Sequence, residues 1–378
     1  MSEYQYYEWQ AIDRRLTEDE QDNIQGLSGH IDVSPSSAVV TYAWGNFKHD
    51  PEDVLVRYFD AHLYLANWGS HRLMFRFPQE LVDHKAVGLY CVDDVVRVRT
   101  TNKYHVLDIR WDKEEGGDWL EGKGLLSSLA PLRENILHGD YRTLYLAWLK
   151  GIDSGETDDK LRRQLEPPVP AGLNDLSPAL KRFVKMFEID TCLIEAAAEA
   201  SPALAPLPTV DFRPLIARLL RQECDDFLYR LTRGEMTVGL ELNKRLLSFV
   251  ERQPIPSVNR RTVGQLLDIA SALKDREKRR EQEEAQKKHV AEMEYLAGHE
   301  EEVWQYIETL IGMKQPKHYD MAVEQMAKLK TLHDYRKSQP VFREKFSALL
   351  ERHSNKPSLK YRIRRANLLD GDAVAGKI

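Results

Sequence analysis

Apolar and polar positions in the first 112 residues follow helical spacing in some segments and strict alternation in others, which predicts a mixed α and β domain. Asp50 is placed to cap a helix with Pro51 at its first position, and the apolar residues between 54 and 59 share one helical face. Thr17 and Glu20 have the spacing of a capping box, which predicts a helix earlier in the chain.

Two β-hairpins are predicted from alternating segments that short turns interrupt. Residues 63–68 and 71–77 are typical of strands on either side of a Gly-Ser turn, and a second pair of strands flanks residues 102–103. With the strand-like run at 38–44, the order of elements is close to a split βαβ plait with an added strand. The sequence therefore predicts the α+β fold class, with a ferredoxin-like N-terminal domain followed by an all-helical C-terminal half.

Helical spacing prevails from residue 118 onward, and proline-rich stretches interrupt it. One helical segment has an apolar stripe formed by Ile216, Leu219, Leu220, Phe227 and Leu231. We expect an α+β domain over 1–150, a linker over 151–178, a helical domain over 179–260, a long charged helix and helical bundle over 261–368, and a frayed tail over 369–378.

The long charged segment has a distinctive middle. Residues 262–313 are predicted to form one long helix or two abutting helices, and between 274 and 288 only Ala285 is apolar. Acidic and basic residues are interleaved there as in the solvated faces of coiled-coil helices. We therefore expect a strut with an exposed middle and with both ends anchored in the helical half.

Strand alternation predicts an arginine-rich face on the N-terminal sheet. Leu73, Phe75 and Phe77 alternate with polar or charged positions and are predicted to enter the core. The opposite face is predicted to carry, as surface residues, Arg72, Arg76, Arg97, Arg99 and Arg110. Trp68, beside the first hairpin turn, is a further candidate binding residue because a partner or a covering helix would shield an exposed Trp.

Three interpretations of the arginine face remain open at this point. It binds RNA or single-stranded DNA, as exposed sheet faces of plait domains do. It docks on an acidic surface of a partner or of the chain's own helical half. It is solvated and has no role, as is common for charges on an antiparallel sheet. RNA-binding sheets also need exposed aromatic residues, and the aromatic residues here fall mostly on the apolar face.

Composition narrows the choice of partner and compartment. The chain of 378 residues has a net charge of −6, and residues 1–150 hold 16 basic against 24 acidic residues, which disfavours bulk binding to nucleic acid. No apolar run is long enough to cross a bilayer, the N-terminus lacks the pattern of a signal peptide, and no membrane partner is expected. Cys91, Cys192 and Cys224 form no framework of pairs, so we expect a cytoplasmic protein.

One constellation resembles a catalytic site, although we expect no catalytic residues. Asp108 in a predicted strand, followed by Glu121 and Lys123, matches the pattern in which carboxylates hold Mg²⁺ and a lysine orients the attacking water. The glycine-rich surroundings of Glu121 indicate a loop rather than the strand that such a site needs. No phosphate loop, nucleophile elbow or HExxH motif is present, and we expect neither a cofactor nor a bound metal.

Two stretches are similar to known proteins. The strings "YEWQAIDR" and "YFDAHLYLANWG" resemble a family of uncharacterised bacterial proteins over about the first 150 residues, and this resemblance implies no particular activity. The tail, with "YDMAVEQMAKLKTL" and "KPSLKYRIRRANLL", looks like the helical C-terminal region of bacterial SWIM zinc-finger proteins. The CxC and CxH pairs of that zinc finger are missing, so the second resemblance implies only a helical interaction module.

These patterns together predict a non-catalytic cytoplasmic protein-interaction or adaptor protein, whose partner is another protein. The alternative is a protein that binds nucleic acid, or processes it with a metal ion, through the arginine face.

Overall fold

The computed structural model describes residues 3–92, 95–113, 122–153, 159–204, 212–235, 237–249 and 260–368. Contacts divide the chain into two compact units, Met1–Lys274 and Asp275–Ile378, which are described separately below. The expected domain boundaries at 150, 178 and 260 concern independent folding, and they stay predictions.

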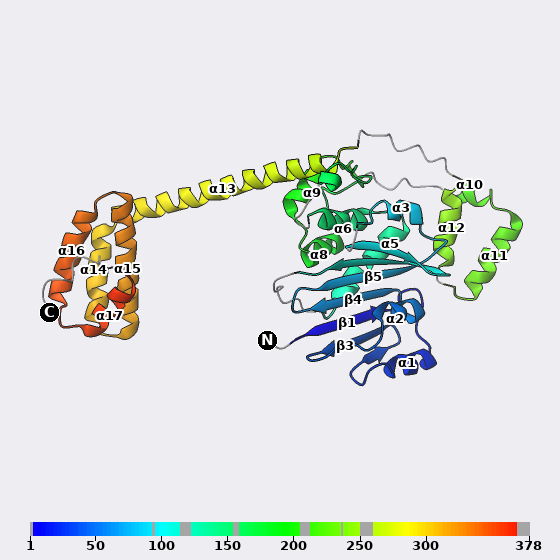
Figure 1. Cartoon of the computed structure of the whole chain (residues 1–378), viewed down its shortest axis with the longest axis horizontal. Coiled ribbons are helices and arrows are strands. Elements are labelled where there is room, and N and C mark those ends of the chain that lie inside the picture. The colour runs from blue at the N-terminus through cyan, green and yellow to red at the C-terminus, as the bar shows by residue number, and fades with distance from the viewer. Residues whose placement is uncertain are drawn as a thin grey trace. The chain divides into compact units, whose positions relative to one another are not determined.

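The first unit is built on a seven-stranded antiparallel sheet (Figure 1). In spatial order the strands are β2 (Asp32–Ser34), β3 (Ser37–Tyr42), β1 (Gln5–Gln10), β4 (Ala61–Ala66), β5 (His71–Pro78), β7 (Tyr104–Trp111) and β6 (Val96–Thr100). Both predicted hairpins are present, and Gly69 has the positive φ of +99° that the first turn requires. The α+β fold class is confirmed.

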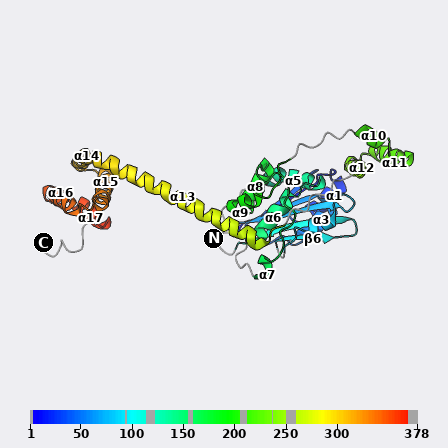
Figure 2. The ribbon, with the colours of Figure 1, turned by 90° about the horizontal axis from the view of Figure 1, so that it is seen from above.

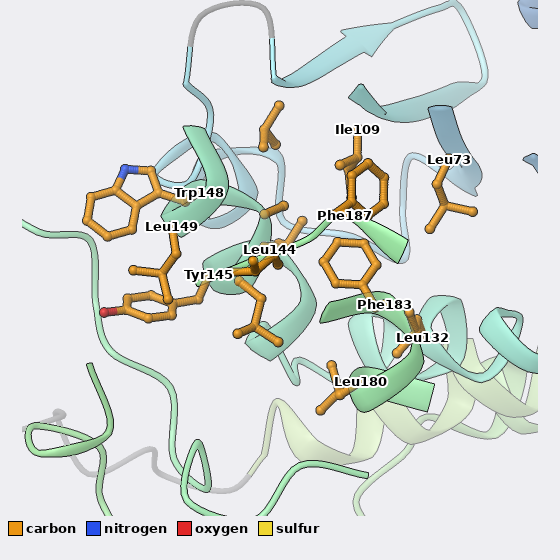
Figure 3. Close-up of a cluster of buried hydrophobic side chains, with 14 of the residues drawn as sticks. Leu73, Ile109, Leu132, Leu144, Tyr145, Trp148, Leu149, Leu180, Phe183 and Phe187 are labelled. Atoms are coloured by element: carbon orange, nitrogen blue, oxygen red, sulfur yellow. The ribbon is translucent and has the colours of Figure 1, made fainter. Parts of the chain in front are cut away.

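One face of the sheet forms the larger core with a layer of helices. Leu73, Phe75 and Phe77 enter it from β5 as predicted. Figures 1 and 2 show α5, α6 and α8 on this side of the sheet, and Figure 3 shows Phe183 and Phe187 among its side chains. The helices that cover this face or lie beside it are α3 (His84–Gly88), α4 (Leu125–Leu129), α5 (Pro131–Leu137), α6 (Arg142–Ile152), α8 (Pro178–Met186) and α9 (Thr191–Ala198).

The opposite face packs on α1 (Glu18–Gln25) and α2 (Pro51–Tyr58). Both helices begin where their capping residues predict, with Thr17 and Glu20 forming the capping box of α1 and Asp50 capping α2. Apolar residues of α2 meet aromatic residues of β1 in a smaller core, which includes Tyr7, Trp9, Val54, Leu55, Tyr58 and Met74. The sheet therefore has helices on both faces.

The proline-rich segment at 165–178 contributes buried groups to the first unit. Leu173 lies in the larger core, and the buried carboxylate of Glu166 accepts hydrogen bonds from Tyr145 and Arg261. Arg261 also donates to the carbonyl oxygen of Ala196 in α9. This cluster fixes the start of α13 (Val263–Gly298) against the core; the short helix α7 (Asp159–Arg162) lies just before the segment.

A separate group of short helices, α10 (Phe212–Ile216), α11 (Arg221–Thr232) and α12 (Val238–Leu247), is held together largely by charged side chains. Arg230 forms ion pairs with Glu235 at 2.8 Å and Glu241 at 2.7 Å. Arg245 pairs with Glu223 at 2.9 Å, which joins α12 to α11. In this group, most of the leucine side chains of α10 and α11 remain outside any core.

The second unit is a bundle formed by α14 (Glu300–Gly312), α15 (Pro316–Tyr335), α16 (Gln339–Arg352) and α17 (Pro357–Arg365), with the end of α13 (Figure 1). Its core takes apolar side chains from every one of these helices, among them Met293, Ile307, Met326, Phe346 and Ile363. The all-helical character predicted for this half is confirmed.

The long charged segment forms two abutting helices, α13 and α14, which meet at His299. All residues from 274 to 288 are exposed, so the prediction of an exposed middle is confirmed. Its first end is anchored in the first unit, where Val263 and Leu266 pack into the core that the sheet shares with α8 and α9. Apolar residues at the end of a helix predict that this end packs against another element. Which element it packs against depends on the tertiary fold.

Candidate functional site

Four polar or aromatic residues form a row across the middle of the sheet on the α2 side. Tyr7 in β1 is the register partner of Tyr64 in β4, Tyr64 is that of Arg72 in β5, and Arg72 is that of Arg110 in β7. Side chains of directly opposed residues lie side by side on one face of a sheet. The row therefore gathers two phenol rings and two guanidinium groups from four neighbouring strands.

Carboxylates neutralise most of the charge on this arginine face. Arg72 binds Asp108 through two parallel hydrogen bonds of 2.7 and 2.8 Å and lies 3.6 Å from Glu52 of α2. Glu52 in turn forms an ion pair with Arg99, whose Nε lies 2.5 Å from the Glu52 carboxylate. Bidentate arginine–carboxylate pairs of this kind hold both groups in a fixed geometry.

Arg76 corrects the prediction of a wholly solvent-facing arginine face, because only 6% of the residue is exposed. Its guanidinium donates to Asp60 at 2.6 Å and to the carbonyl oxygen of Val56 at 2.7 Å. Burial raises the pKa of Asp60, but Arg76 and Arg133 outweigh burial and hold this pKa below its usual range. Strand alternation placed Arg76 on the correct face, but it did not reveal that α2 covers this face.

The remaining candidate binding residues lie toward the edges. Arg97 and Arg99 are exposed on the edge strand β6, and Arg110 is partly exposed with its guanidinium 3.5 Å from Asp108. Trp68 is exposed beside the turn between β4 and β5, as the sequence predicts, and its indole N–H donates to Ser70. The structure thus gathers Arg72 and Arg110 in the row and leaves Trp68 at the turn.

A buried histidine, His62, lies next to the row and has one ring nitrogen without a partner. His62 is fully buried, and its Nδ1 donates to the carbonyl oxygen of Glu8 at 3.0 Å. Burial and the nearby Arg72 charge lower the pKa of His62 to about 3, so the ring is neutral at physiological pH. Nε2 then carries a lone pair, and this atom has no hydrogen-bond donor among the described residues.

A cavity of about 280 Å³ opens at this place on the α2 side of the sheet. The row supplies four of its lining residues, Tyr7, Tyr64, Arg72 and Arg110, and His62 adds a fifth. Pockets of this type combine aromatic walls with a few polar groups that orient a ligand. The cavity can therefore offer a hydrogen-bond acceptor and positive charge to one small molecule.

The nuclease-like constellation is not assembled in the described structure. Asp108 faces α2 and is paired with Arg72. Lys123 is exposed just before α4, whose residues belong to the core on the other face of the sheet. The structure therefore does not bring Asp108 and Lys123 together, and Glu121 lies outside the described residues.

Sequence reasoning missed several of the most constrained polar residues. His62 lies just before the predicted strand at 63–68, and no sequence pattern marks His62, Asp60 or Arg133 as functional. Arg133 is almost fully buried and binds Asp13 through two hydrogen bonds of 2.8 and 2.7 Å. Their partners are distant in sequence, so no local spacing could reveal them. Tyr7 had a local signal, since the aromatic-rich run at 4–9 favours a strand.

A second surface with functional potential lies on α11. None of its residues, all of which the structure describes, is buried. The N-cap Leu220 and the helix residues Leu228 and Leu231, together called the apolar stripe of α11 below, are instead exposed, by 68%, 58% and 48%. Phe227, which the sequence places on the same stripe, is half-buried. Contiguous exposed apolar side chains on a folded protein mark interaction surfaces.

Comparison with known proteins adds no assignment: no family model, no curated protein and no solved structure matches the chain. Within the described ranges, no helix combines the length and apolar character needed to span a membrane. In the same part of the chain, no three His, Cys, Asp or Glu side chains are grouped as ligands for a metal ion.

Proposed function

We propose that the protein is a non-catalytic interaction or adaptor protein, and that the apolar stripe of α11 is its contact surface for another protein. The observation that carries this proposal is the exposure of Leu220, Leu228 and Leu231 on a helix that has no buried residue. Amphipathic helices normally turn such a stripe toward a core. When a partner binds, its side chains bury a stripe that the chain itself leaves exposed.

The occupant that fits this surface is an amphipathic helix of the partner. The exposed Leu220, at the N-cap, and Leu231, near the end of α11, share one face with the half-buried Cys224 and Phe227, and these four residues follow one another at spacings of 4, 3 and 4. This is the spacing at which two helices pack along their length with interlocking side chains. Arg221 and Asp225, an ion pair of 3.0 Å on one flank of the stripe, supply polar groups that would border the contact.

A photo-crosslinking experiment tests the proposal. A photoreactive phenylalanine is introduced at Leu228 in one variant and at Gln222, exposed on the far side of α11, in a matched control. We expect a discrete protein adduct from position 228 in host cells and none from position 222. The same adduct should disappear when Leu220→Ser and Leu231→Ser are added.

The result has two outcomes that contradict the proposal. Equal adducts from both positions would mean that the contact is not selective for the stripe. The absence of any adduct from position 228 would mean that the stripe has no protein partner in the host.

The alternative proposal, nucleic-acid binding or processing through the arginine face, has weaker support. Arg76 is buried against Asp60 and could reach a phosphate only if this pair broke, and the charge of Arg72 is already balanced by Asp108, which leaves little net positive charge for a polyanion. Arg99 is also paired, with Glu52. Salt-sensitive binding of RNA or single-stranded DNA by the purified protein, lost in Arg97→Ala/Arg99→Ala, would favour this alternative.

Three finer assignments belong to the same proposal. A cytoplasmic location is supported by Cys91, Cys192 and Cys224, which are joined by no disulfide. Kinship with ferredoxin-like plaits is supported by one split βαβ unit, in which β3 and β4 flank β1 and are joined through α2. The bacterial family, the SWIM-like tail and the coiled-coil character of α13 rest on the sequence patterns alone.

A further inference from the structure

The cavity beside His62 has the features of a built binding site. It is bounded by side chains from four adjacent strands, and its volume of about 280 Å³ is close to the lower limit for small-molecule pockets. Tyr7 and Tyr64 form one wall, with ring centroids 4.7 Å apart. The site therefore has room for a small organic molecule.

The cavity contains an acceptor that needs a donor. Nδ1 of His62 donates to a backbone carbonyl oxygen, which can only accept, so Nε2 must carry the lone pair. Nε2 is buried and unpartnered among the described residues, and His62 lines the cavity. A buried acceptor without a donor destabilises the fold, and a ligand that supplies an O–H or N–H would remove this penalty.

The tyrosine hydroxyls can add further acceptors. Tyr7 and Tyr64 both donate their hydroxyl protons to Oε1 of Gln5, at 2.7 and 3.2 Å. Their oxygen atoms keep lone pairs that can accept from a ligand. Asp112, an exposed carboxylate that also lines the cavity, is a further acceptor at its edge.

Arg72 and Arg110 keep guanidinium donors at the cavity that Asp108 and Glu52 do not use, and these donors suit an anionic group on the same ligand. Arg72 uses Nε and Nη2 for Asp108, and its Nη1 donors have no acceptor within the described structure. Arg110 makes one long contact of 3.5 Å with Asp108, so most of its donors also remain available among the described groups. Arginine donors in this arrangement match a carboxylate.

We propose that this cavity binds a small carboxylate that also carries a hydroxyl or ammonium group next to the acid. The carboxylate binds Arg72 and Arg110, and the hydroxyl or ammonium group donates to Nε2 of His62. α-Hydroxy acids and α-amino acids both have this chemistry. The inference is independent of the α11 surface and assigns a second, ligand-binding role to the N-terminal sheet.

Three small acids that differ at one group test the proposal with the full-length protein. L-lactate and L-alanine each differ from propionate at the carbon next to the carboxylate, where they carry a hydroxyl or an ammonium group. Binding is followed by calorimetry and by ligand-observed NMR. We expect L-lactate or L-alanine to bind at least about tenfold more tightly than propionate, because propionate leaves Nε2 without a donor.

Two variants locate the binding, and a third serves as a control. His62→Asn can still donate to the carbonyl oxygen of Glu8 but has no acceptor at the Nε2 position, so it should reduce the preference over propionate to less than about threefold. Arg110→Ala, at a partly exposed position, should weaken all three acids by about tenfold or more. Arg57→Ala, on the exposed side of α2, should leave binding unchanged.

Several outcomes would overturn the proposal. No saturable binding of L-lactate or L-alanine would mean that the cavity holds only water. Equal binding of propionate and the two donor-bearing acids would remove the role of His62. Binding that persists in Arg110→Ala would place the acid elsewhere, and this result remains informative if His62→Asn fails to fold.

Discussion

The α2 face of the sheet and the apolar stripe of α11 reverse the usual distribution of charged and apolar side chains. On the sheet, Arg76 is buried against Asp60, and Arg72 is held by Asp108. On α11, leucines that helical spacing would place in a core are exposed. On both surfaces, apolar and polar residues are spaced as the secondary structure predicts. The surfaces differ in whether another element of the chain covers them.

The two surfaces use their charged side chains in different ways. The buried Arg76 is paired with Asp60 and donates to the carbonyl oxygen of Val56, and these contacts fix α2 and the end of β5 relative to each other. In the group of α10, α11 and α12, ion pairs such as Arg245–Glu223 hold the helices together. The leucines of the α11 stripe remain exposed. A surface of the first kind belongs to the folded core, whereas a surface of the second kind is available to a partner.

The largest expected loss of stability comes from substitutions at buried residues of the sheet. Arg76→Ala should lower the free energy of unfolding by about 3–5 kcal/mol, because it removes the 2.6 Å partner of the buried Asp60 carboxylate and leaves only the more distant Arg133, at 3.9 Å, to balance its charge. Phe75→Ala should cost about the same, since it opens a cavity in the core. Arg99→Ala, at a side chain that is 56% exposed, should cost less than about 1 kcal/mol. Urea denaturation measures all three, and similar small costs for Arg76→Ala and Arg99→Ala would show that Arg76 is not structurally required.

The pH dependence of stability tests the neutral state of His62. Its folded pKa of about 3 lies below the ordinary value of 6.5, so the unfolded chain binds the proton more readily between these values. Stability should therefore fall as pH falls from 6.5, by roughly 1.4 kcal/mol per pH unit from this group. Burial also lowers the pKa of His71 and His105, with the same sign, and raises that of Glu8, with the opposite sign.

Comparison with a variant isolates the contribution of His62. Urea denaturation of His62→Asn between pH 6.5 and pH 5 should show a slope smaller by roughly 1.4 kcal/mol per pH unit than that of the natural chain. Identical slopes would mean that the folded and unfolded states protonate His62 alike, which would contradict a lowered pKa for this ring.

A smaller effect is expected for the half-buried pair in the row. Asp108→Asn keeps the shape of the side chain but weakens the two charge-assisted bonds to Arg72, and it should cost about 1–3 kcal/mol. Asp32→Asn, at an exposed carboxylate on the edge strand β2, should cost less than about 0.5 kcal/mol. Thermal unfolding of both variants gives the comparison, and equal shifts would mean that the pair adds nothing to stability.

Sequence patterns predicted local structure well where a short range of residues decides it. The caps at Thr17 and Asp50, the turn at Gly69 and the exposed charged middle of α13 all depend on neighbouring residues. The central strand β1 was not predicted, although its aromatic residues favour a strand, because the adjacent Tyr6 and Tyr7 interrupt the alternation of apolar and polar positions. Without β1, the register that brings Tyr7 to Tyr64 and Arg72 could not be drawn.

The candidate site was predictable only in part for the same reason. Alternation placed Arg72 and Arg110 correctly on one face. The burial of Arg76 and the open acceptor of His62 depend on α2 and on a backbone carbonyl of β1, which are long-range contacts. Local periodicity carries no information on such contacts, so it could not distinguish an exposed arginine face from a covered one.

Substitutions in the exposed stripe of α11 should have the smallest effect on stability and the largest effect on function. We expect the variant Leu220→Ser/Leu231→Ser to change the free energy of unfolding by less than about 0.5 kcal/mol, because neither side chain is buried. The same variant should lose the partner that photo-crosslinking at position 228 identifies.

Measuring both quantities on this one variant tests the central claim most directly. Purified partner is titrated onto the natural chain and onto Leu220→Ser/Leu231→Ser, and both proteins are unfolded in urea. The account predicts at least about a tenfold loss of affinity with unchanged stability. Unchanged affinity, or a loss of stability above about 2 kcal/mol, would show that the stripe of α11 belongs to the fold rather than to a partner.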